Sequence, residues 1–103
     1  MSQSSDEAFP VRLKGDSMWP TYPEGTVLMF HPMAISDVEV NDVVLVHHPM
    51  KKDLLIVKRV HRIEPDGRLF LIGDQPDPLA SEDSHNFGPV HLDNLIGVAL
   101  KAE

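Results

Sequence analysis

The sequence has 103 residues, a length typical of one domain, and its hydrophobic content of 42% suits a single modest core. It contains no cysteine, which excludes disulfides, thiolate chemistry and cysteine-based zinc sites. Sixteen acidic and nine basic residues give a net charge of −7, which opposes contact with a phosphate backbone, so we expect no nucleic-acid partner.

The first eight residues are polar and acidic, and we expect a flexible tail over residues 1–8 followed by one domain over residues 9–103. This start lacks the basic and apolar stretches of a secretory signal. No apolar run approaches the roughly 20 residues that a membrane-spanning helix needs. We therefore expect a soluble protein without a membrane anchor, located in the cytoplasm.

From Phe9 onward, short apolar stretches rich in β-branched residues alternate with turn residues, a pattern typical of short strands joined by tight turns. Nine prolines and six glycines leave little room for a long helix. The clearest hairpin turn is Pro65-Asp66-Gly67. We predict a mostly β fold, a single compact domain of short antiparallel strands. The expected strands are Val27–Phe30, Val43–Val46, Leu54–Ile63, Leu69–Ile72 and Leu95–Leu100.

The segment Gly15–Thr21 places Ser17 between an acidic residue and two bulky apolar ones. Gly15 permits a tight turn or a close approach by another chain, and Pro20 prevents a helix from continuing. Such a segment can turn the hydroxyl and the backbone N–H of Ser17 toward one cleft, as acyl transfer requires. The alternative is a plain turn with a hydrogen-bonded serine.

Lys58 lies in the most apolar of the predicted strands, where alternation places it on the same face as Ile56 and Val60. Burial there lowers the pKa of an amine because it disfavours the ammonium form. A neutral amine can accept the proton of a serine hydroxyl without a His–Asp pair. The alternative is an edge-strand lysine whose ammonium reaches into water.

Between Gly73 and Val90 the chain is dense in hydroxyls and carboxylates, among them Ser81, Asp83 and Ser84. Small polar groups of this kind can orient a buried amine by hydrogen bonding. A solvated loop rich in turns is the alternative reading of the same composition.

Taken in order, these segments resemble the successive conserved boxes of the signal peptidase I family. Within it, the chain is most similar to a small soluble branch, the nickel-type superoxide dismutase maturation proteases. The first resemblance is carried by Gly15-x-Ser17-Met18-x-Pro20-Thr21, Asn41-Asp42-Val43-Val44, Lys58-Arg59-Val60, Gly73-Asp74 and Ser81-x-Asp83-Ser84, and the second by Val46-His47-His48-Pro49, Pro65-Asp66-Gly67-Arg68, Leu71-Ile72-Gly73-Asp74 and Asn86-Phe87-Gly88-Pro89-Val90.

The resemblance implies a signal peptidase I-like catalytic core with Ser17 as nucleophile and Lys58 as general base and acid. The backbone N–H of Ser17 would help to form the oxyanion hole, and Gly15, where some relatives have serine, leaves the second donor open. The other implied site residues are Asp16, Ser81, Asp83 and Ser84 around the dyad, and Met18 and Trp19 at the substrate pockets. Trp19 equally suits a core or rim anchor.

Two departures from the family stand out. His85 occupies the position of an arginine that pairs with the aspartate at Asp83, and we expect this pair to need a protonated imidazole. Asn41 replaces a glycine, which is a smaller change because asparagine tolerates left-handed backbone geometry.

By the same resemblance, the partner is a precursor protein whose N-terminal extension is removed, with the nickel superoxide dismutase precursor expected. No metal ion or organic cofactor is expected. The sequence does not indicate an oligomeric state.

Two other functions also fit parts of the sequence. A self-cleaving Ser–Lys peptidase of the SOS type shares the Gly-x-Ser-Met start but carries a cleavable segment well upstream, and no Ala-Gly or Cys-Gly bond precedes Ser17 here. A non-enzymatic nickel-binding or chaperone protein is suggested by six histidines, including His47 and His48. Neighbours on a strand point to opposite faces, which is poor geometry for sharing one metal ion.

Overall fold

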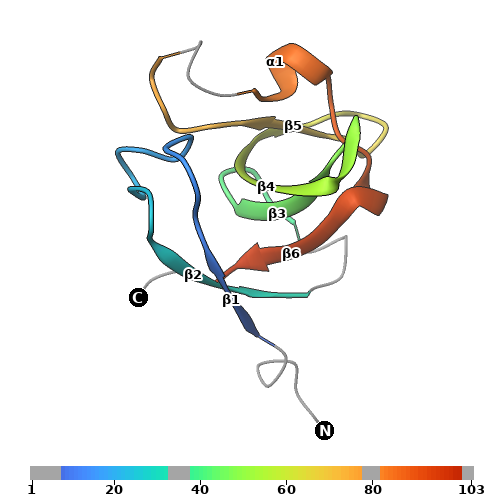
Figure 1. The fold of residues 1–103 in the computed structure, drawn as a ribbon. Coiled ribbons are helices and arrows are strands. Elements are labelled where there is room, and N and C mark those ends of the chain that lie inside the picture. Colours follow the sequence, from blue (N-terminus) through green and yellow to red (C-terminus); the bar gives the residue numbers. More distant parts are fainter. Residues whose placement is uncertain (1–7, 33–37, 78–81, 101–103) are drawn as a thin grey trace, which may run out of the picture.

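The computed structural model describes residues 8–32, 38–77 and 82–100 (Figure 1). Within them, six strands form one antiparallel sheet in the order β1-β2-β6-β3-β4-β5, which confirms the mostly β prediction. The strands are β1 (Phe9–Arg12), β2 (Val27–His31), β3 (Val43–His48), β4 (Lys51–Ile63), β5 (Leu69–Ile72) and β6 (Leu95–Ala99), with a short helix α1 (Ser84–Phe87) and a 3₁₀ helix η3 (Leu92–Asn94).

All five predicted strands are present, and β4 is longer than expected because its pairing with β3 continues down to His48 and Lys51. Strand β1 was not predicted, since Pro10 falls inside it. Proline is tolerated there because β1 is an end strand of the sheet, paired with β2 alone among the described strands. Apart from Ala8, the predicted tail lies outside the described residues, and β1 begins at Phe9.

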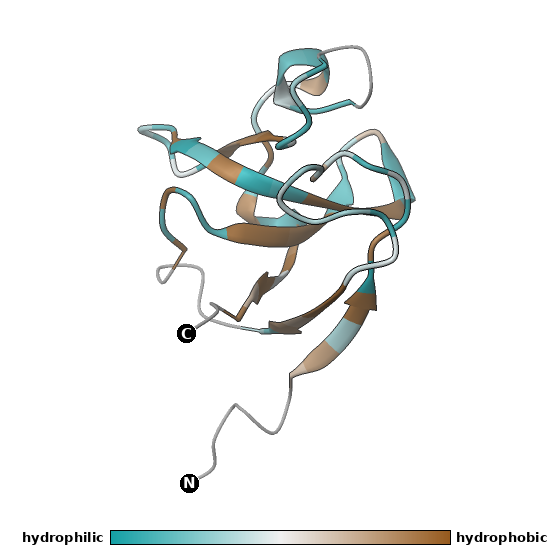
Figure 2. Cartoon of the chain, turned by 90° about the vertical axis from the view of Figure 1, so that its left-hand side faces the viewer, coloured by the Kyte–Doolittle hydropathy of each residue, from teal (hydrophilic) through white to brown (hydrophobic). Residues whose placement is uncertain are grey.

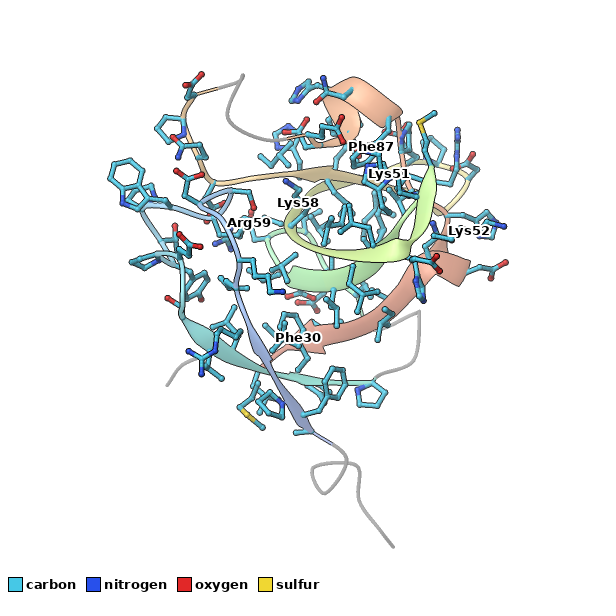
Figure 3. The ribbon with its side chains drawn as sticks, in the orientation of Figure 1. Phe30, Lys51, Lys52, Lys58, Arg59 and Phe87 are labelled. Carbon is cyan, nitrogen blue, oxygen red and sulfur yellow. The ribbon has the colours of Figure 1, made fainter. Side chains whose placement is uncertain are left out.

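The interior is organised around β3, whose first four residues are buried on both faces of the sheet. Alternation sends Val44 and Val46 into one hydrophobic cluster, and Val43 and Leu45 into another. Figure 2 shows the apolar residues concentrated in the strands, with polar residues in many of the connections. Figure 3 labels Phe30 of β2, which belongs to the second cluster, and Phe87, the last residue of α1, which packs against the first.

Two turns lie at the C-terminal end of the long strand β4. In the predicted hairpin, Gly67 has φ of 92° and its N–H donates to the Glu64 carbonyl at 2.8 Å. Asn41, before β3, has φ of 80°, which confirms the left-handed geometry expected at this position. Its N–H donates to the Val60 carbonyl at 2.8 Å, so this turn also helps to fix the pairing register of β3 and β4.

A helix able to cross a lipid bilayer would have to be far longer and more apolar than any found in the described parts of the chain.

The burial of Leu71 gives a direct test of the packing. Its side chain is fully buried in the first hydrophobic cluster, so we expect Leu71→Ala to lower the free energy of unfolding by about 2–5 kcal/mol through lost burial and a residual cavity. Denaturant unfolding followed by circular dichroism measures this. Met50→Ala, at a position that is 75% exposed, is the control and should change stability little. Equal stability of the two variants would contradict this packing.

Candidate active site

Ser17 lies in a turn between β1 and β2 whose backbone is tightly defined. Gly15 has φ of 76°, and nothing lies within 4 Å of where its Cβ would be, so glycine serves the backbone angle here and not a close approach. The Trp19 N–H donates to the Asp16 carbonyl at 3.0 Å. Met18, only 2% exposed, anchors the turn in the hydrophobic core. Ser17 therefore lies in a turn whose backbone is anchored by a hydrogen bond and by the buried side chain of Met18.

The same turn is held from a second side by the segment that follows β5. The backbone N–H of Gln75 donates to the Ser17 carbonyl at 2.9 Å, and its side-chain amide donates to the Asp16 carbonyl at 3.3 Å. The Gly73–Gln75 part of the third sequence motif thus contacts the first motif directly. Sequence reasoning gave Gln75 no role, because nothing in the spacing shows which loop it reaches.

Lys58 is in β4, paired with Val44 of β3, and is only 3% exposed (Figure 3). Burial of the amine lowers its pKa because water no longer solvates the ammonium form, while the negative charges of Asp83 and Glu82 oppose that effect in part. The side chain does not reach into water, so the snorkelling alternative is wrong. Lys58 is neutral at a lower pH than an ordinary lysine.

Ser17 and Lys58, far apart in the sequence, line the same two adjoining clefts. The larger, the apolar cleft, has a volume of about 470 Å³ and runs between β1 and β4. The smaller, the polar cleft, has a volume of about 280 Å³. Leucine and valine side chains dominate the apolar cleft: Val11, Leu13, Leu45, Leu54, Leu55 and Val57, together with Ile56 and Met18. The polar cleft is lined by Asp16, His48 and Glu82 in addition to Ser17 and Lys58.

Arg59, the neighbour of Lys58, forms a bidentate ion pair with Asp74. Its Nε donates to Oδ1 at 2.8 Å and its Nη2 to Oδ2 at 2.7 Å, while Nη1 donates to the Asn41 carbonyl at 2.8 Å. Burial alone would raise the pKa of Asp74, but hydrogen bonds from Arg59 and Thr21 and the Arg59 charge outweigh it and lower that pKa. The pair joins β4 to the serine turn through Thr21, a link that sequence reasoning missed.

Two of the predicted supporting residues act through helix α1. Asp83 caps it, accepting the His85 N–H at 2.9 Å and lying 3.0 Å from the His85 Nδ1. Ser84 is buried, and its Oγ accepts the Leu71 N–H at 2.8 Å, which ties α1 to β5. A neutral imidazole with its proton on Nδ1 also donates to a carboxylate, so the Asp83–His85 contact does not require protonation, contrary to expectation. Ser81 lies outside the described residues.

The two predicted substrate-pocket residues differ in placement. Met18 is in the core and also lines the apolar cleft. Trp19 is 46% exposed, and neither of the two clefts includes it among its lining residues. Lys14, His48 and Glu82, which line the polar cleft, were not predicted as site residues. Only the fold brings these three positions to one place.

The antiparallel β domain therefore places a serine and a buried lysine on one cleft. Comparison with protein families matches residues 1–87 to the family described as Peptidase S24-like, and the chain belongs to it. The match supports a serine peptidase in general terms and the superfamily that joins LexA-like and signal peptidase I-like proteins. A search of curated proteins found no match.

The Arg59–Asp74 pair predicts a pH-dependent contribution to stability. Because the pKa of Asp74 is lower in the folded protein than its ordinary 3.8, the ionised carboxylate stabilises the fold above that pH, and the contribution disappears as the pH falls through the folded value. Asp74→Asn should lower the free energy of unfolding at pH 7 by about 1–3 kcal/mol. Urea unfolding at pH 7 and near pH 3 measures both.

The difference between wild type and Asp74→Asn should shrink at the lower pH. Asp53→Asn is the control, since that residue is exposed in β4 and its substitution should change stability little. A wild-type advantage over Asp74→Asn that is the same at both pH values would show that the ion pair does not stabilise the fold in this way.

Proposed function

We propose that this chain is a serine endopeptidase in which Ser17 is the nucleophile and Lys58 the general base. The observation that carries the proposal is that both side chains line one pair of adjoining clefts, with Lys58 buried. Burial favours the neutral amine, which is the form that can take a proton from a serine hydroxyl. The family match supports the same chemistry at a coarser level.

In the acylation step, the Lys58 amine accepts the proton of the Ser17 hydroxyl as Oγ bonds to the scissile carbonyl carbon. The carbonyl oxygen becomes an oxyanion, for which the backbone N–H of Ser17 is one donor. When the tetrahedral intermediate collapses, the carbon–nitrogen bond breaks and the Lys58 ammonium gives its proton to the leaving amine. The products are an acyl-enzyme on Ser17 and a new N-terminus.

In the second step, Lys58 is neutral again and takes a proton from water, whose oxygen attacks the acyl carbon. The ester bond breaks, and the Ser17 oxygen recovers its proton from the Lys58 ammonium. Every proton is carried by the dyad and water, so we expect no metal ion or organic cofactor to be required.

Substrate recognition follows from the strands that border the apolar cleft. Residues 55–58 of β4 pair with β3 on one side, whereas the described pairing of β4 with β5 begins at Arg59. Strand β1 is an end strand of the sheet. An extended peptide can therefore hydrogen-bond to an open strand edge, with apolar side chains of limited size entering the cleft. Met18 lines the apolar cleft, and we propose that the exposed Trp19 contacts the substrate outside it.

The proposed substrate is a precursor protein with a removable N-terminal extension, and the nickel superoxide dismutase precursor is the specific proposal. That choice rests on the resemblance of the sequence motifs and on nothing in the cleft itself. We propose a cytoplasmic location for the reaction. Self-cleavage remains an outcome that the cleavage experiment can reveal, since the matched family accommodates it.

A nickel-binding role for the histidines is not favoured. His47 is exposed, and its Nδ1 lies 2.9 Å from the Lys52 carbonyl oxygen, whereas His48 is buried on the other face of β3. The two rings therefore do not converge on one ion, as strand alternation predicts. Among the described residues, no group of three or more His, Asp and Glu side chains is placed to hold a metal ion.

The cleavage experiment compares wild type, Ser17→Ala and Lys58→Met on purified nickel superoxide dismutase precursor, read by intact mass. Methionine preserves the length of the buried side chain while removing the base. We expect wild type to remove the N-terminal extension, and each variant to lose at least about 10³-fold in rate. Folding is checked by circular dichroism. Full activity in a correctly folded Lys58→Met would disprove the mechanism.

The same reaction should depend on pH in a defined direction. Because the neutral amine is the base, kcat/KM should rise with pH through the lowered pKa of Lys58, below the ordinary lysine value of 10.5. Rates measured from about pH 6 to pH 9 cover the relevant limb for a tuned catalytic lysine. A flat profile over that range would contradict a titrating lysine base.

A further inference from the structure

His48 is a buried histidine in the wall of the polar cleft, with both ring nitrogens engaged. It is 3% exposed at the end of β3. Its Nδ1 accepts the Met50 N–H at 3.0 Å, and its Nε2 lies 3.2 Å from Oε1 of Glu82. The ring of Phe87 meets it edge-on, with the ring centres 4.9 Å apart. This packing fixes the orientation of the imidazole.

The two contacts define which nitrogen carries the proton. Because the Met50 N–H must donate into Nδ1, the neutral imidazole carries its hydrogen on Nε2, and that hydrogen points at Glu82. The carboxylate of Glu82 is itself 58% exposed. The N–H of the buried His48 ring therefore sets the orientation of the Glu82 carboxylate. An exposed glutamate without such a donor would sample many rotamers.

We propose that His48 and Glu82 are positioning residues for Lys58: the buried imidazole fixes the Glu82 carboxylate at the polar cleft and so sets the pH range in which Lys58 serves as a base. This inference rests on the proposed function. His48, Glu82, Lys58 and Ser17 all line the polar cleft. Neither His48 nor Glu82 belongs to the motifs that carry the proposed dyad.

The physical effect has a clear sign. A fixed carboxylate near an amine favours the ammonium form, so Glu82 raises the pKa of Lys58 against the larger effect of burial. Without that charge, burial acts with less opposition and the amine loses its proton at lower pH. The result is a weaker base that is neutral over a wider pH range.

Other charges face the same amine and limit the size of the effect. Asp83, at the start of α1, contributes more than Glu82. Lys14 and Asp16, from the serine turn, line the polar cleft. Lys51 approaches Glu82 itself at 4.0 Å. Since Glu82 is one of several charges and is partly solvated, its effect should be smaller than that of a buried ion pair.

The first test is the pH profile of kcat/KM for Glu82→Gln, which removes the charge and keeps the shape. We expect the acid limb to move to lower pH by about half a unit to one unit, less than the 1–3 units typical of close buried pairs. Glu64→Gln is the matched control, because Glu64 pairs with Arg62 outside either cleft. An unmoved acid limb in Glu82→Gln would overturn the proposal.

Two substitutions of His48 separate positioning from simple packing. Glutamine keeps a side-chain donor long enough to reach Glu82, whereas asparagine keeps the acceptor for Met50 but is too short for that reach. We expect His48→Asn to shift the acid limb as Glu82→Gln does, and His48→Gln to restore most of the wild-type profile. Glu82→Gln combined with His48→Asn should add no further shift. A merely structural His48 would change stability and leave the limb in place.

A readout independent of cleavage distinguishes failure of this inference from failure of the proposed function. The rate of Lys58 acetylation by acetic anhydride, followed against pH by peptide mass spectrometry, reports the fraction of neutral amine. A lower midpoint in Glu82→Gln and His48→Asn supports the positioning role even if no precursor is cleaved, in which case the peptidase assignment fails by itself. An unchanged midpoint in both variants overturns the inference even if cleavage proceeds.

Discussion

The burial of one amine, that of Lys58, is the constraint on which the site depends. Removing an ammonium from water costs several kcal/mol in a protein interior, so such a group loses its proton or acquires close partners. The face of β4 that carries Lys58 also carries Ile56 and Val60, and the paired strand offers Val44. The sheet therefore holds the amine where the neutral form is favoured, on the cleft that also contains Ser17.

Two adjacent basic residues of β4, Lys58 and Arg59, have different chemistry because their surroundings differ. Lys58 is buried among apolar side chains and interacts electrostatically with the carboxylates of Asp83 and Glu82. Arg59 instead forms a bidentate ion pair with Asp74. The hydrogen bonds to Asp74 raise the pKa of Arg59, so this side chain stays charged and structural. Strand alternation places the two side chains on opposite faces of β4. One face carries Lys58, the proposed base, and the other carries Arg59, whose ion pair with Asp74 joins β4 to the serine turn.

Much of the fold was predictable because short-range pattern determines it. Strands rich in β-branched residues between turn residues were found where expected, and alternation alone predicted that Lys58 shares a face with Ile56 and Val60. Strand β1 escaped prediction because Pro10 is acceptable only at the edge of a sheet, and edge position is a property of the whole topology. Helix α1 escaped because four residues are too few for a periodic signal, and only the Asp83 cap defines its start.

The contacts missed in the site share one physical cause. The Arg59–Asp74, Ser17–Gln75 and His48–Glu82 contacts join segments whose separation in sequence carries no geometric information. Composition could show that polar groups cluster after β5, but not which of them meet the serine turn, the arginine or the buried histidine. Those pairings exist only once the sheet has curled to bring β1 opposite β4 across the apolar cleft.

The most direct test of whether burial lowers the pKa of Lys58 is a titration of the lysine side chains by NMR. The Lys58 resonance is assigned by its loss in Lys58→Met. We expect the Lys58 amine to titrate below the ordinary lysine value of 10.5, because burial disfavours its ammonium form. A Lys58 amine that titrates at or above 10.5 would contradict the claim that burial prepares this residue as a base.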